Sequence, residues 1–285
     1  MNLAQALQQS AYVLSINGIE DSYIEARMLL GLVANLSSVQ IHTEPEQILS
    51  REEEGKLQEL VDRRLKHEPA AYILKNREFY GIDFYVDSRV LIPRPETEIL
   101  VDAALEFATG RSSYLKRALL VADIGTGCGA IAINLALNLR GSKVYATDIS
   151  TSALEVARLN CQHHKVTEQV TLLSGDLVQP IPEPVDLMVA NLPYIKNSEL
   201  TNLSPEIANF EPRMALDGGR NGLDCLQRLL PQVKEKIHTG GCLLLEIGQN
   251  QEPDISRLIH NCLDEVNFRF IADYNCIKRA VKIDL

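Results

Sequence analysis

The N-terminal part of the chain places apolar side chains three and four positions apart, which is the spacing of an amphipathic helix. This pattern predicts helices near residues 3–14 and 23–33, and a third helix with a highly charged outer face over residues 51–65. Asp21 stands where its side chain would cap the second of these helices. We therefore expect a small helical domain over residues 1–74 that carries no catalytic site of its own.

The pattern then changes to alternating aromatic and β-branched residues around Gly81. Such alternation about a glycine predicts a β-hairpin within residues 78–90. The proline-rich run at 92–95 fixes an extended turn, and the residues after it, 96–107, return to helical spacing. We expect residues 75–91 to form a hairpin linker that leads into a second domain.

Strand and helix patterns alternate through this second domain, residues 92–285. Strands are predicted at 119–124, 143–147, 170–173, 185–190, 242–247, 268–273 and 280–285, and helices at 130–139, 152–163, 223–237 and 254–262. Regular alternation of this kind is typical of an α/β fold with a doubly wound, mostly parallel sheet that has helices on both faces. Because the last two strands follow each other directly, we expect one antiparallel partner in a seven-stranded sheet.

Composition narrows the classes of function. No apolar stretch is long enough to span a membrane, and residues 1–10 lack the pattern of a signal peptide. We therefore expect a cytoplasmic protein with no membrane partner. The 38 acidic residues outnumber the 28 basic ones, and a formal net charge of −10 disfavours a nucleic-acid partner. The six cysteines form no CxxC pair, so we expect neither a metal site nor a disulfide framework.

The sharpest motif is a glycine-rich loop between the first strand and the first helix of the second domain. It reads Asp123-Ile124-Gly125-Thr126-Gly127-Cys128-Gly129. Glycines let the backbone turn tightly and approach a ligand, with amide groups at the helix start free to donate. Asp148 ends the next strand and Asp176 follows the third. Acids at three successive strand ends suit a nucleoside that carries a cationic sulfonium, although all three could instead be helix caps.

A second motif, Asn191-Leu192-Pro193-Tyr194, follows the fourth strand, at the sheet edge where open α/β folds place their chemistry. Asn191 offers one acceptor and two donors, Pro193 fixes the backbone so that a carbonyl projects, and Tyr194 supplies a flat face. Together they could hold a planar NH2 group, with its N–H bonds directed at the Asn191 oxygen and a carbonyl near Leu192 or Pro193. The competing interpretation is an ordinary turn at a strand end.

The glycine loop with Asp148 and Asp176 resembles the first motifs of class I S-adenosylmethionine methyltransferases, whose fold is Rossmann-like. The resemblance implies S-adenosyl-L-methionine as cofactor and S-adenosyl-L-homocysteine as product, with Asp148 on the ribose and Asp176 and Leu177 beside the adenine. The implied cofactor residues are Asp123, Gly125, Thr126, Gly127, Cys128, Gly129, Asp148, Asp176, Leu177 and Asn191. A nicotinamide dehydrogenase is the alternative, but its GxGxxG spacing is missing.

Further segments resemble the release-factor glutamine methyltransferases over nearly the whole chain. They are 72–74, 77–81, 92–98, 211–219 and 246–248. The resemblance implies methylation of the side-chain nitrogen, N5, of the glutamine in the GGQ motif of peptide-chain release factors, which supports translation termination. It implies that the helical domain and the hairpin grip this protein substrate. Asn191, Pro193 and Tyr194 would be catalytic, and Leu192, Pro93, Arg94 and Glu96 would bind the substrate. By the same resemblance, residues 93–98 and 211–219 would border the glutamine pocket.

Two departures from that family keep other functions open. The family usually has proline where Leu192 stands and glycine where Lys75 stands. Because the tetrapeptide also resembles motifs of adenine-N6 methyltransferases, an RNA or DNA adenine is the alternative acceptor. A catalytically silent scaffold is a third reading. Arg94 and Glu96 could form no more than a surface ion pair, and Cys128 could be a reactive thiol or only a small loop residue. We expect a monomer.

Overall fold

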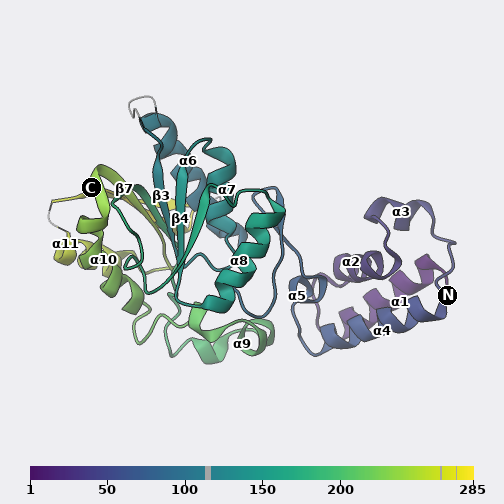
Figure 1. The fold of residues 1–285 in the computed structure, drawn as a ribbon. Coiled ribbons are helices and arrows are strands. Elements are labelled where there is room, and N and C mark those ends of the chain that lie inside the picture. Colours follow the sequence, from purple (N-terminus) through teal and green to yellow (C-terminus); the bar gives the residue numbers. More distant parts are fainter. Residues whose placement is uncertain (113–116, 264, 274) are drawn as a thin grey trace. The chain divides into compact units, whose positions relative to one another are not determined.

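The structure is a computed structural model that describes residues 1–112, 117–263, 265–273 and 275–285. The chain divides into two compact units (Figure 1). One comprises Met1–Asn76 together with Ser204–Phe210, and the other comprises Arg77–Leu203 together with Glu211–Leu285. Among the helices of these described residues, none combines the length and the apolar character that crossing a bilayer demands.

The first unit is a helical bundle. Its helices are α1 (Leu3–Ile16), α2 (Ser22–Ala34), α3 (Ser38–Thr43), α4 (Arg51–Leu65) and α5 (Ala70–Leu74). The three predicted helices are confirmed, and the short helices α3 and α5 are additional. Asn2, Ser37 and Ser50 begin α1, α3 and α4 with capping boxes. The prediction that the Asp21 side chain caps α2 is wrong, because Asp21 stands at the N-cap position but makes no capping hydrogen bond.

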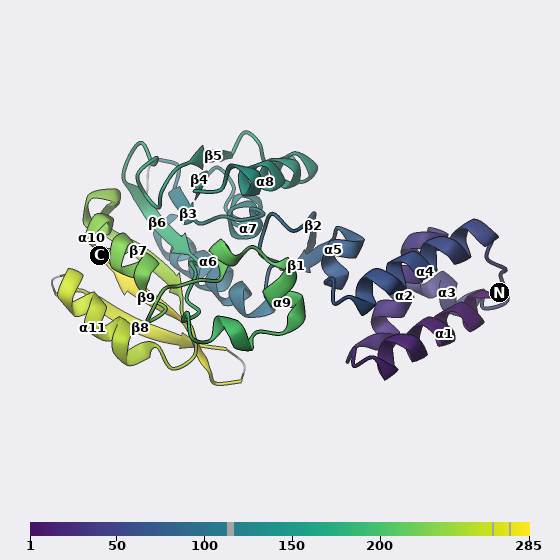
Figure 2. The ribbon, with the colours of Figure 1, turned by 90° about the horizontal axis from the view of Figure 1, so that it is seen from below.

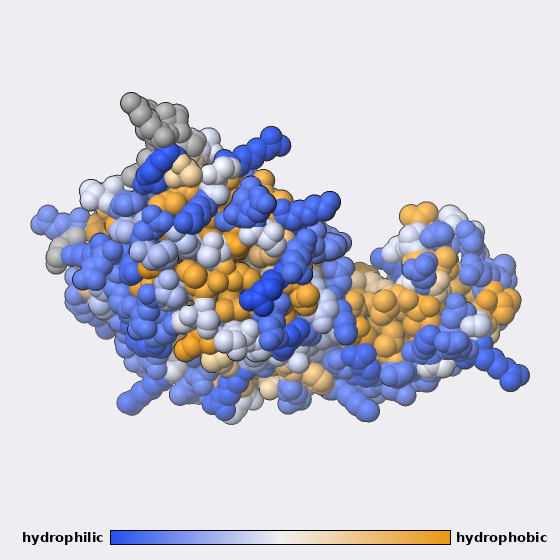
Figure 3. Space-filling view, in the orientation of Figure 1, coloured by the Kyte–Doolittle hydropathy of each residue, from blue (hydrophilic) through white to orange (hydrophobic). Residues whose placement is uncertain are grey.

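The bundle buries one apolar cluster and also exposes apolar side chains. Leu3, Leu14, Leu29 and Leu30 are fully buried at its centre. Figure 3 shows apolar surface on the side of this unit that faces the viewer. Large apolar residues that remain exposed on the unit are Met1, Tyr12, Ile16, Tyr23, Ile24, Met28, Leu32, Val39 and Ile48.

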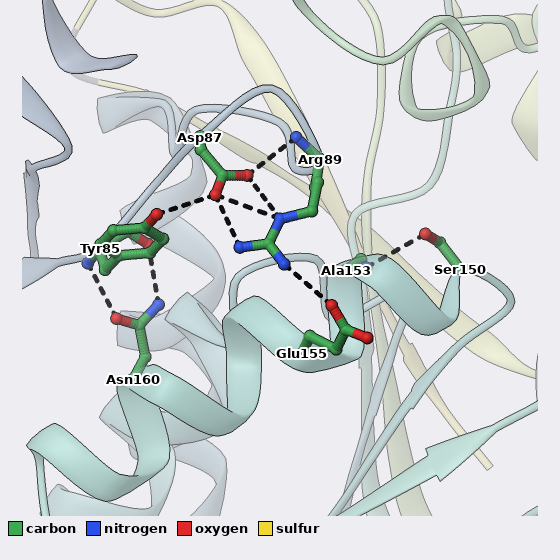
Figure 4. Close-up of polar contacts among 7 residues, drawn as sticks. All are labelled: Tyr85, Asp87, Arg89, Ser150, Ala153, Glu155 and Asn160. Carbon is green, nitrogen blue, oxygen red and sulfur yellow. Dashed lines mark hydrogen bonds and ion pairs between the residues drawn. The ribbon is translucent and has the colours of Figure 1, made fainter. Parts of the chain in front are cut away.

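The second unit begins with the predicted hairpin, formed by β1 (Arg77–Phe79) and β2 (Ile82–Phe84). Tyr80 and Gly81 both have positive φ, 53° and 75°, as a two-residue turn matching the strand twist requires. The residues after β2 are tied to α8 (Thr151–His163). Figure 4 shows Asn160 bonded to both backbone groups of Tyr85, at 2.8 and 3.0 Å, and Arg89 paired with Glu155 at 2.9 Å.

The predicted sheet of seven strands is confirmed, with the order β5-β4-β3-β6-β7-β9-β8. The strands are β3 (Leu120–Ile124), β4 (Lys143–Asp148), β5 (Val170–Ser174), β6 (Val185–Ala190), β7 (Ile237–Glu246), β8 (Asn267–Ala272) and β9 (Lys278–Asp284). The first five are parallel, and β9 runs antiparallel to both β7 and β8. Strand β7 begins earlier than predicted, and its pairing with β6 is irregular between Val185 and Leu187.

Helices pack against the two faces of this sheet (Figure 2). The 3-10 turn η1 (Pro95–Thr97) leads into α6 (Glu98–Ser112), which contacts α7 (Ala130–Asn138), and α7 contacts α8. Helices α10 (Asp224–Lys236) and α11 (Glu252–Cys262) contact each other, and their buried residues join an apolar cluster with β6 and β7. Because β3 to β7 are parallel, their carboxyl ends meet along one edge.

The region between β6 and α10 has more structure than the sequence predicted. It contains η2 (Leu200–Asn202), α9 (Pro205–Phe210) and η3 (Arg213–Ala215). These elements are short, so no periodicity could reveal them. An isolated bridge between Ile195 and Asp217 brings the two ends of the region together.

Candidate functional site

The glycine loop leaves β3 with three residues in the left-handed region. The φ values of Gly125, Gly127 and Gly129 are 73°, 56° and 87°, so the chain turns in a way that other residues resist. The amide groups of Gly125 and Thr126 both donate to the Thr147 carbonyl at 2.9 Å, and Gly129 donates to Thr126 at 2.8 Å. The sequence led us to expect free amide groups at the start of the helix, and of these the amide of Gly129, the N-cap residue of α7, is already bonded within the loop.

Asp148 holds the loop to the end of β4. Its Oδ2 accepts from the Gly127 amide at 2.9 Å and its Oδ1 from the Ser150 amide at 2.8 Å. Helix α8 is capped by Ser150, whose hydroxyl accepts from Ala153 (Figure 4), so the reading of Asp148 as that helix's cap is wrong. Burial raises the pKa of Asp148, while the backbone amides that face it lower it.

Asp123 lies at the centre of the loop and is fully buried. Its Oδ2 accepts from the Thr126 hydroxyl at 2.6 Å and from the Ala132 amide in the first turn of α7 at 3.1 Å. This second bond is the kind a capping acid makes. Its Oδ1 is buried and has no partner among the described residues. Burial raises the pKa of Asp123 to about 6, although both hydrogen bonds act in the opposite direction.

The third strand end contributes Asp176 and Leu177. Asp176 pairs with Arg228 of α10. Leu177 has a φ of 51°, and its carbonyl accepts from the Thr147 hydroxyl at 2.9 Å. This bond joins the end of β5 to the strand end that also holds the glycine loop.

Cys128 is an inert part of the loop. Its side chain is buried, and burial raises the pKa of the thiol to about 12. A thiol reacts mainly as its thiolate. The interpretation of Cys128 as a small residue in a tight loop therefore agrees with its surroundings, and a reactive thiol does not.

The Asn191-Leu192-Pro193-Tyr194 motif leaves β6 directly beside the glycine loop. A β-carbon added to Gly125 would lie 3.0 Å from Leu192 Cδ2 and 3.7 Å from the Asn191 carbonyl oxygen. The glycine is thus needed for close approach as well as for its backbone angles. The fold brings together the two motifs that the sequence analysis assigned to cofactor and acceptor.

Both polar side chains of this motif have defined partners. Asn191 Nδ2 donates to Thr97 Oγ1 at 3.1 Å, and the Tyr194 hydroxyl donates to Glu246 Oε1 at 3.2 Å. Burial and the Glu246 carboxylate raise the pKa of Tyr194, so the phenol stays protonated. The Tyr194 carbonyl accepts from Gln251 Nε2 at 3.0 Å. The motif is therefore held by residues of β7 and η1 and by Gln251, the N-cap residue of α11.

Glu211 joins residues 92–94 to the region that follows the Asn191-Leu192-Pro193-Tyr194 motif. Its carboxylate accepts from the Ile92 amide at 3.2 Å and pairs with Arg94. The reading of Arg94 and Glu96 as an ion pair is therefore wrong, since Arg94 pairs across the site and Glu96 is exposed. Pro93, which lies between Ile92 and Arg94 in the sequence, is buried.

Gly218 lies against the backbone of the Asn191-Leu192-Pro193-Tyr194 motif. A β-carbon there would lie 2.7 Å from Tyr194 Cα and 2.8 Å from the Pro193 carbonyl oxygen. The glycines of residues 211–219 are therefore more than a tight turn, because one of them permits a close approach to Pro193 and Tyr194.

Thr97 was expected only as one member of a segment, residues 93–98, that borders the pocket, and Glu246 was not assigned a role from the sequence. Glu246 lies in a segment that was quoted only for the family resemblance. A signal was present in the sequence for Glu246, because an acid ends a run of leucines, Leu243–Leu245, that is fully buried in the structure. An acid that directly follows such an apolar run is a candidate for a functional site.

Comparison with known proteins identifies relatives along the whole chain. A family model described as "PrmC N-terminal domain" matches residues 5–74, and one described as "Ribosomal protein L11 methyltransferase (PrmA)" matches residues 106–213. The chain is 38% identical over 275 residues to a release factor glutamine methyltransferase of Moorella thermoacetica, covering 96% of this chain and 95% of that protein. It is 36% identical to the protein of the same name from Koribacter versatilis, covering 99% of this chain and 98% of that protein.

Solved structures share the fold at low identity. A methyltransferase from Pyrococcus furiosus has a TM-score of 0.51 at 16% identity and covers 72% of this chain and 90% of its own. The catalytic domain of hMettl16, solved in complex with the MAT2A 3'UTR hairpin 6, has a TM-score of 0.57 at 16% identity and covers 78% and 81%. At this identity the likeness establishes the fold alone.

Proposed function

The chain belongs to the release factor glutamine methyltransferase family, and on that premise we propose the following reaction for it. It transfers a methyl group from S-adenosyl-L-methionine to the side-chain amide nitrogen, N5, of the glutamine in the GGQ motif of a peptide-chain release factor. The observation that carries this proposal is the contact between the glycine loop at Gly125 and the acceptor motif at Leu192. A methyl donor and an acceptor amide must meet at such a junction.

Two features of the loop support a cofactor site. Asp123 keeps a buried carboxylate oxygen that has no partner in the described part of the chain, and a buried acceptor without a donor is costly unless a ligand supplies one. Nothing lies within 4 Å of the position that a β-carbon on Gly127 would take, so there is room against the loop. When bound, S-adenosyl-L-methionine supplies a methyl group activated by its sulfonium, and S-adenosyl-L-homocysteine is the product.

Asn191 suits the acceptor amide because of how its own amide is turned. Since its nitrogen donates to Thr97, its oxygen is left to accept an N–H bond of the substrate. A main-chain carbonyl near Leu192 or Pro193 would accept the second N–H, and Tyr194 would stack on the amide plane. We assign Asn191, Pro193 and Tyr194 to catalysis, and Pro93, Arg94, Glu96 and Leu192 to the surrounding pocket.

These contacts address the central difficulty of the reaction, which is that an amide nitrogen is a poor nucleophile. Its lone pair is conjugated with the carbonyl, and this conjugation gives amides a rotation barrier of about 18–20 kcal/mol. Acceptors placed to favour a more tetrahedral nitrogen stabilise the transition state more than the ground state. Orientation can contribute a further 7–11 kcal/mol or so. The methylated nitrogen is strongly acidic, so its proton can pass to a carbonyl or to water.

The domain roles and the cellular context are part of the same proposal. Residues 1–74 would recognise the release factor, residues 75–91 would link this domain to the methyltransferase domain at 92–285, and the enzyme would act as a cytoplasmic monomer. The alternative, adenine-N6 methylation of RNA or DNA, has less support, because relatives covering nearly the whole chain are named for the glutamine reaction and the net charge is −10.

A radiolabelled methyl-transfer assay tests the proposal. Purified release factor, its GGQ glutamine-to-alanine variant and ribosomal RNA are offered in parallel, and we expect label on the intact release factor only. Label on the RNA would transfer support to the adenine alternative. The Asn191→Ala enzyme serves as a second arm, for which we expect binding of S-adenosyl-L-methionine by calorimetry but no turnover. Normal turnover by this variant would remove Asn191 from the site.

A further inference from the structure

Glu246 is a buried acid at the end of β7, in hydrogen-bond contact with Tyr194. It is 4% exposed and follows three leucines that are fully buried. Its Oε1 accepts from the Tyr194 hydroxyl at 3.2 Å, while Oε2 is buried and lacks a partner within the described residues. Placing a carboxylate in such surroundings opposes folding. Its presence therefore points to a role other than stability.

Thr97 connects this acid to Asn191. The threonine oxygen accepts a hydrogen bond from Asn191 Nδ2 at 3.1 Å. A hydroxyl group has only one proton. Thr97 lowers the pKa of Glu246, as a hydroxyl that donates to a carboxylate does, which argues that this proton faces Glu246. On this argument the donors run from Asn191 to Thr97, which is a hydrogen bond of the structure, and from Thr97 toward Glu246.

This order decides which end of the Asn191 amide faces the substrate. If Thr97 had to donate to Asn191 instead, the amide would turn over and present its NH2 group to the acceptor nitrogen, which also carries hydrogens. A carboxylate prevents this because it only accepts hydrogen bonds. The same carboxylate accepts from Tyr194 and thereby fixes the ring that is to stack on the substrate amide.

We propose that Glu246 is the positioning residue of the acceptor site, acting through Thr97 on Asn191 and directly on the hydroxyl of Tyr194. The inference rests on the proposed function and assigns one carboxylate to both sides of the acceptor amide. Glu246 itself need not touch the substrate. Its role is to hold two groups that do, and such prior ordering lowers the barrier to transfer.

The ionised form of Glu246 is the form that performs this role. Burial raises its pKa to about 7, against the hydrogen bonds of Thr97 and Tyr194. The charged groups that act on it are Glu96, which raises its pKa, and Arg279 of β9, which lowers it. Arg94 acts on Tyr194 in the same pocket. As pH falls through this region, the carboxylate gains a proton and loses its preference for accepting, so turnover should fall.

The experiment compares Glu246→Gln, Thr97→Val and Tyr194→Phe with the wild-type enzyme on intact release factor. Glutamine keeps the size of the side chain but offers an NH2 group where an acceptor is needed. Charge-assisted hydrogen bonds lie at the strong end of the range, so we expect Glu246→Gln to lower kcat on the order of 10- to 100-fold. Binding of S-adenosyl-L-methionine and the KM for release factor should change little.

Two further readouts distinguish positioning from a structural role. The wild-type kcat should rise with pH through the neutral range, and this rise should be absent in Glu246→Gln. Adding Thr97→Val to Glu246→Gln should cost less than Thr97→Val costs alone, because both act through Asn191. A matched control is available in Glu183, which accepts from the Tyr145 hydroxyl away from the site. Glu183→Gln and Tyr145→Phe should leave kcat and its pH dependence unchanged.

The outcomes separate this inference from the proposed function. If the wild-type enzyme does not label release factor, the function fails before the variants are compared. If it does, and both Glu246→Gln and Thr97→Val keep kcat within about twofold with the pH profile intact, Glu246 does not position the acceptor site. Should Glu246→Gln fail to fold, Thr97→Val and the wild-type pH profile still decide the matter.

Discussion

Asp123 and Glu246 are two buried acids whose ionisation opposes folding. Each is buried, each keeps one oxygen without a partner in the described chain, and burial raises the pKa to about 6 and about 7 respectively. Acids with shifted pKa values are concentrated at functional sites, where burial and neighbouring charges shift them. Asp123 lies within the glycine loop that we propose holds the cofactor, and Glu246 contacts Tyr194 of the motif that we propose holds the acceptor amide.

For Asp123→Asn we predict a gain in stability that depends on pH. The folded-state pKa is above the unfolded value of 3.8, so ionisation opposes folding once pH exceeds that value. The cost grows between about pH 4 and pH 6 and then stays constant, at no more than about 3 kcal/mol. The neutral asparagine avoids it, so the variant should exceed the wild-type protein in urea unfolding at pH 8 and match it near pH 4.

The same variant should bind S-adenosyl-L-methionine more weakly, because it replaces an oxygen of Asp123 that awaits a donor. Isothermal calorimetry at pH 8 measures this loss. If variant and wild type had equal free energies of unfolding at every pH, burial would not raise the pKa of Asp123.

Gly218→Ala should damage both the fold and the activity. Its new β-carbon would lie 2.7 Å from Tyr194 Cα and 2.8 Å from the Pro193 carbonyl oxygen. Because both are backbone atoms, they cannot move aside as the end of a flexible side chain can. We expect a loss of about 1–3 kcal/mol in the free energy of unfolding, together with a large fall in kcat. Gly110→Ala in α6 is the matched control, since nothing lies within 4 Å of its added carbon. Comparable losses in both variants would show that Gly218 has no special contact.

At the level of residues, the sequence predicts the local motifs but not the hydrogen-bond partners that orient their side chains. The contact between Gly125 and Leu192 follows from parallel strands that end at one edge, so the two motifs could be expected to meet. The bonds from Asn191 to Thr97 and from Tyr194 to Glu246 join residues 94 and 52 positions apart. Such pairings depend on side-chain packing, which periodicity does not encode.

At the level of elements, the strands and long helices were predictable because each has a strong apolar period. Strand β6 is buried at every position, as a central parallel strand should be. The start of β7 was missed because Ile237 fitted the end of the predicted helix at 223–237 and the residues after it, His238 to Gly241, are polar or lack a side chain. Asp21 shows the limit of capping rules, since the right residue type at the right position makes no capping bond.

Two glycines inside helices of the first unit should respond to alanine in opposite directions. Gly55 of α4 has nothing within 4 Å of an added β-carbon, so Gly55→Ala should stabilise this unit by about 0.5–1 kcal/mol through helix propensity. Gly31 of α2 would place that carbon 2.9 Å from the Leu36 carbonyl oxygen, so Gly31→Ala should destabilise it. Urea unfolding followed by circular dichroism measures both, and shifts of the same sign would contradict the prediction.

At the level of the whole molecule, the division into units is not contiguous in sequence. Residues Ser204–Phe210, including α9, group with the helical unit although the residues on either side belong to the other unit. A sequence pattern follows the chain and divides it into consecutive stretches. An excursion of this kind depends on contacts between distant residues, so it could not be foreseen.

This organisation predicts how a ligand should change unfolding. The residues proposed to bind S-adenosyl-L-methionine, Asp123 to Gly129 with Asp148 and Asp176, all lie in the second unit. A ligand that binds only folded protein stabilises it by about 2.7 kcal/mol at a concentration 100 times its Kd. For a unit of this size, that corresponds to an increase in Tm of roughly 5–11 °C.

Scanning calorimetry with and without the cofactor tests this prediction. The two units should give separable transitions, since each has its own apolar core. The transition of the second unit should move to higher temperature, and that of the helical unit should move much less. Asp123→Asn provides the control, because its weaker binding should reduce the shift at the same cofactor concentration. Equal shifts of both transitions would show that the units unfold together, and no shift in either would show that the folded protein does not bind the cofactor.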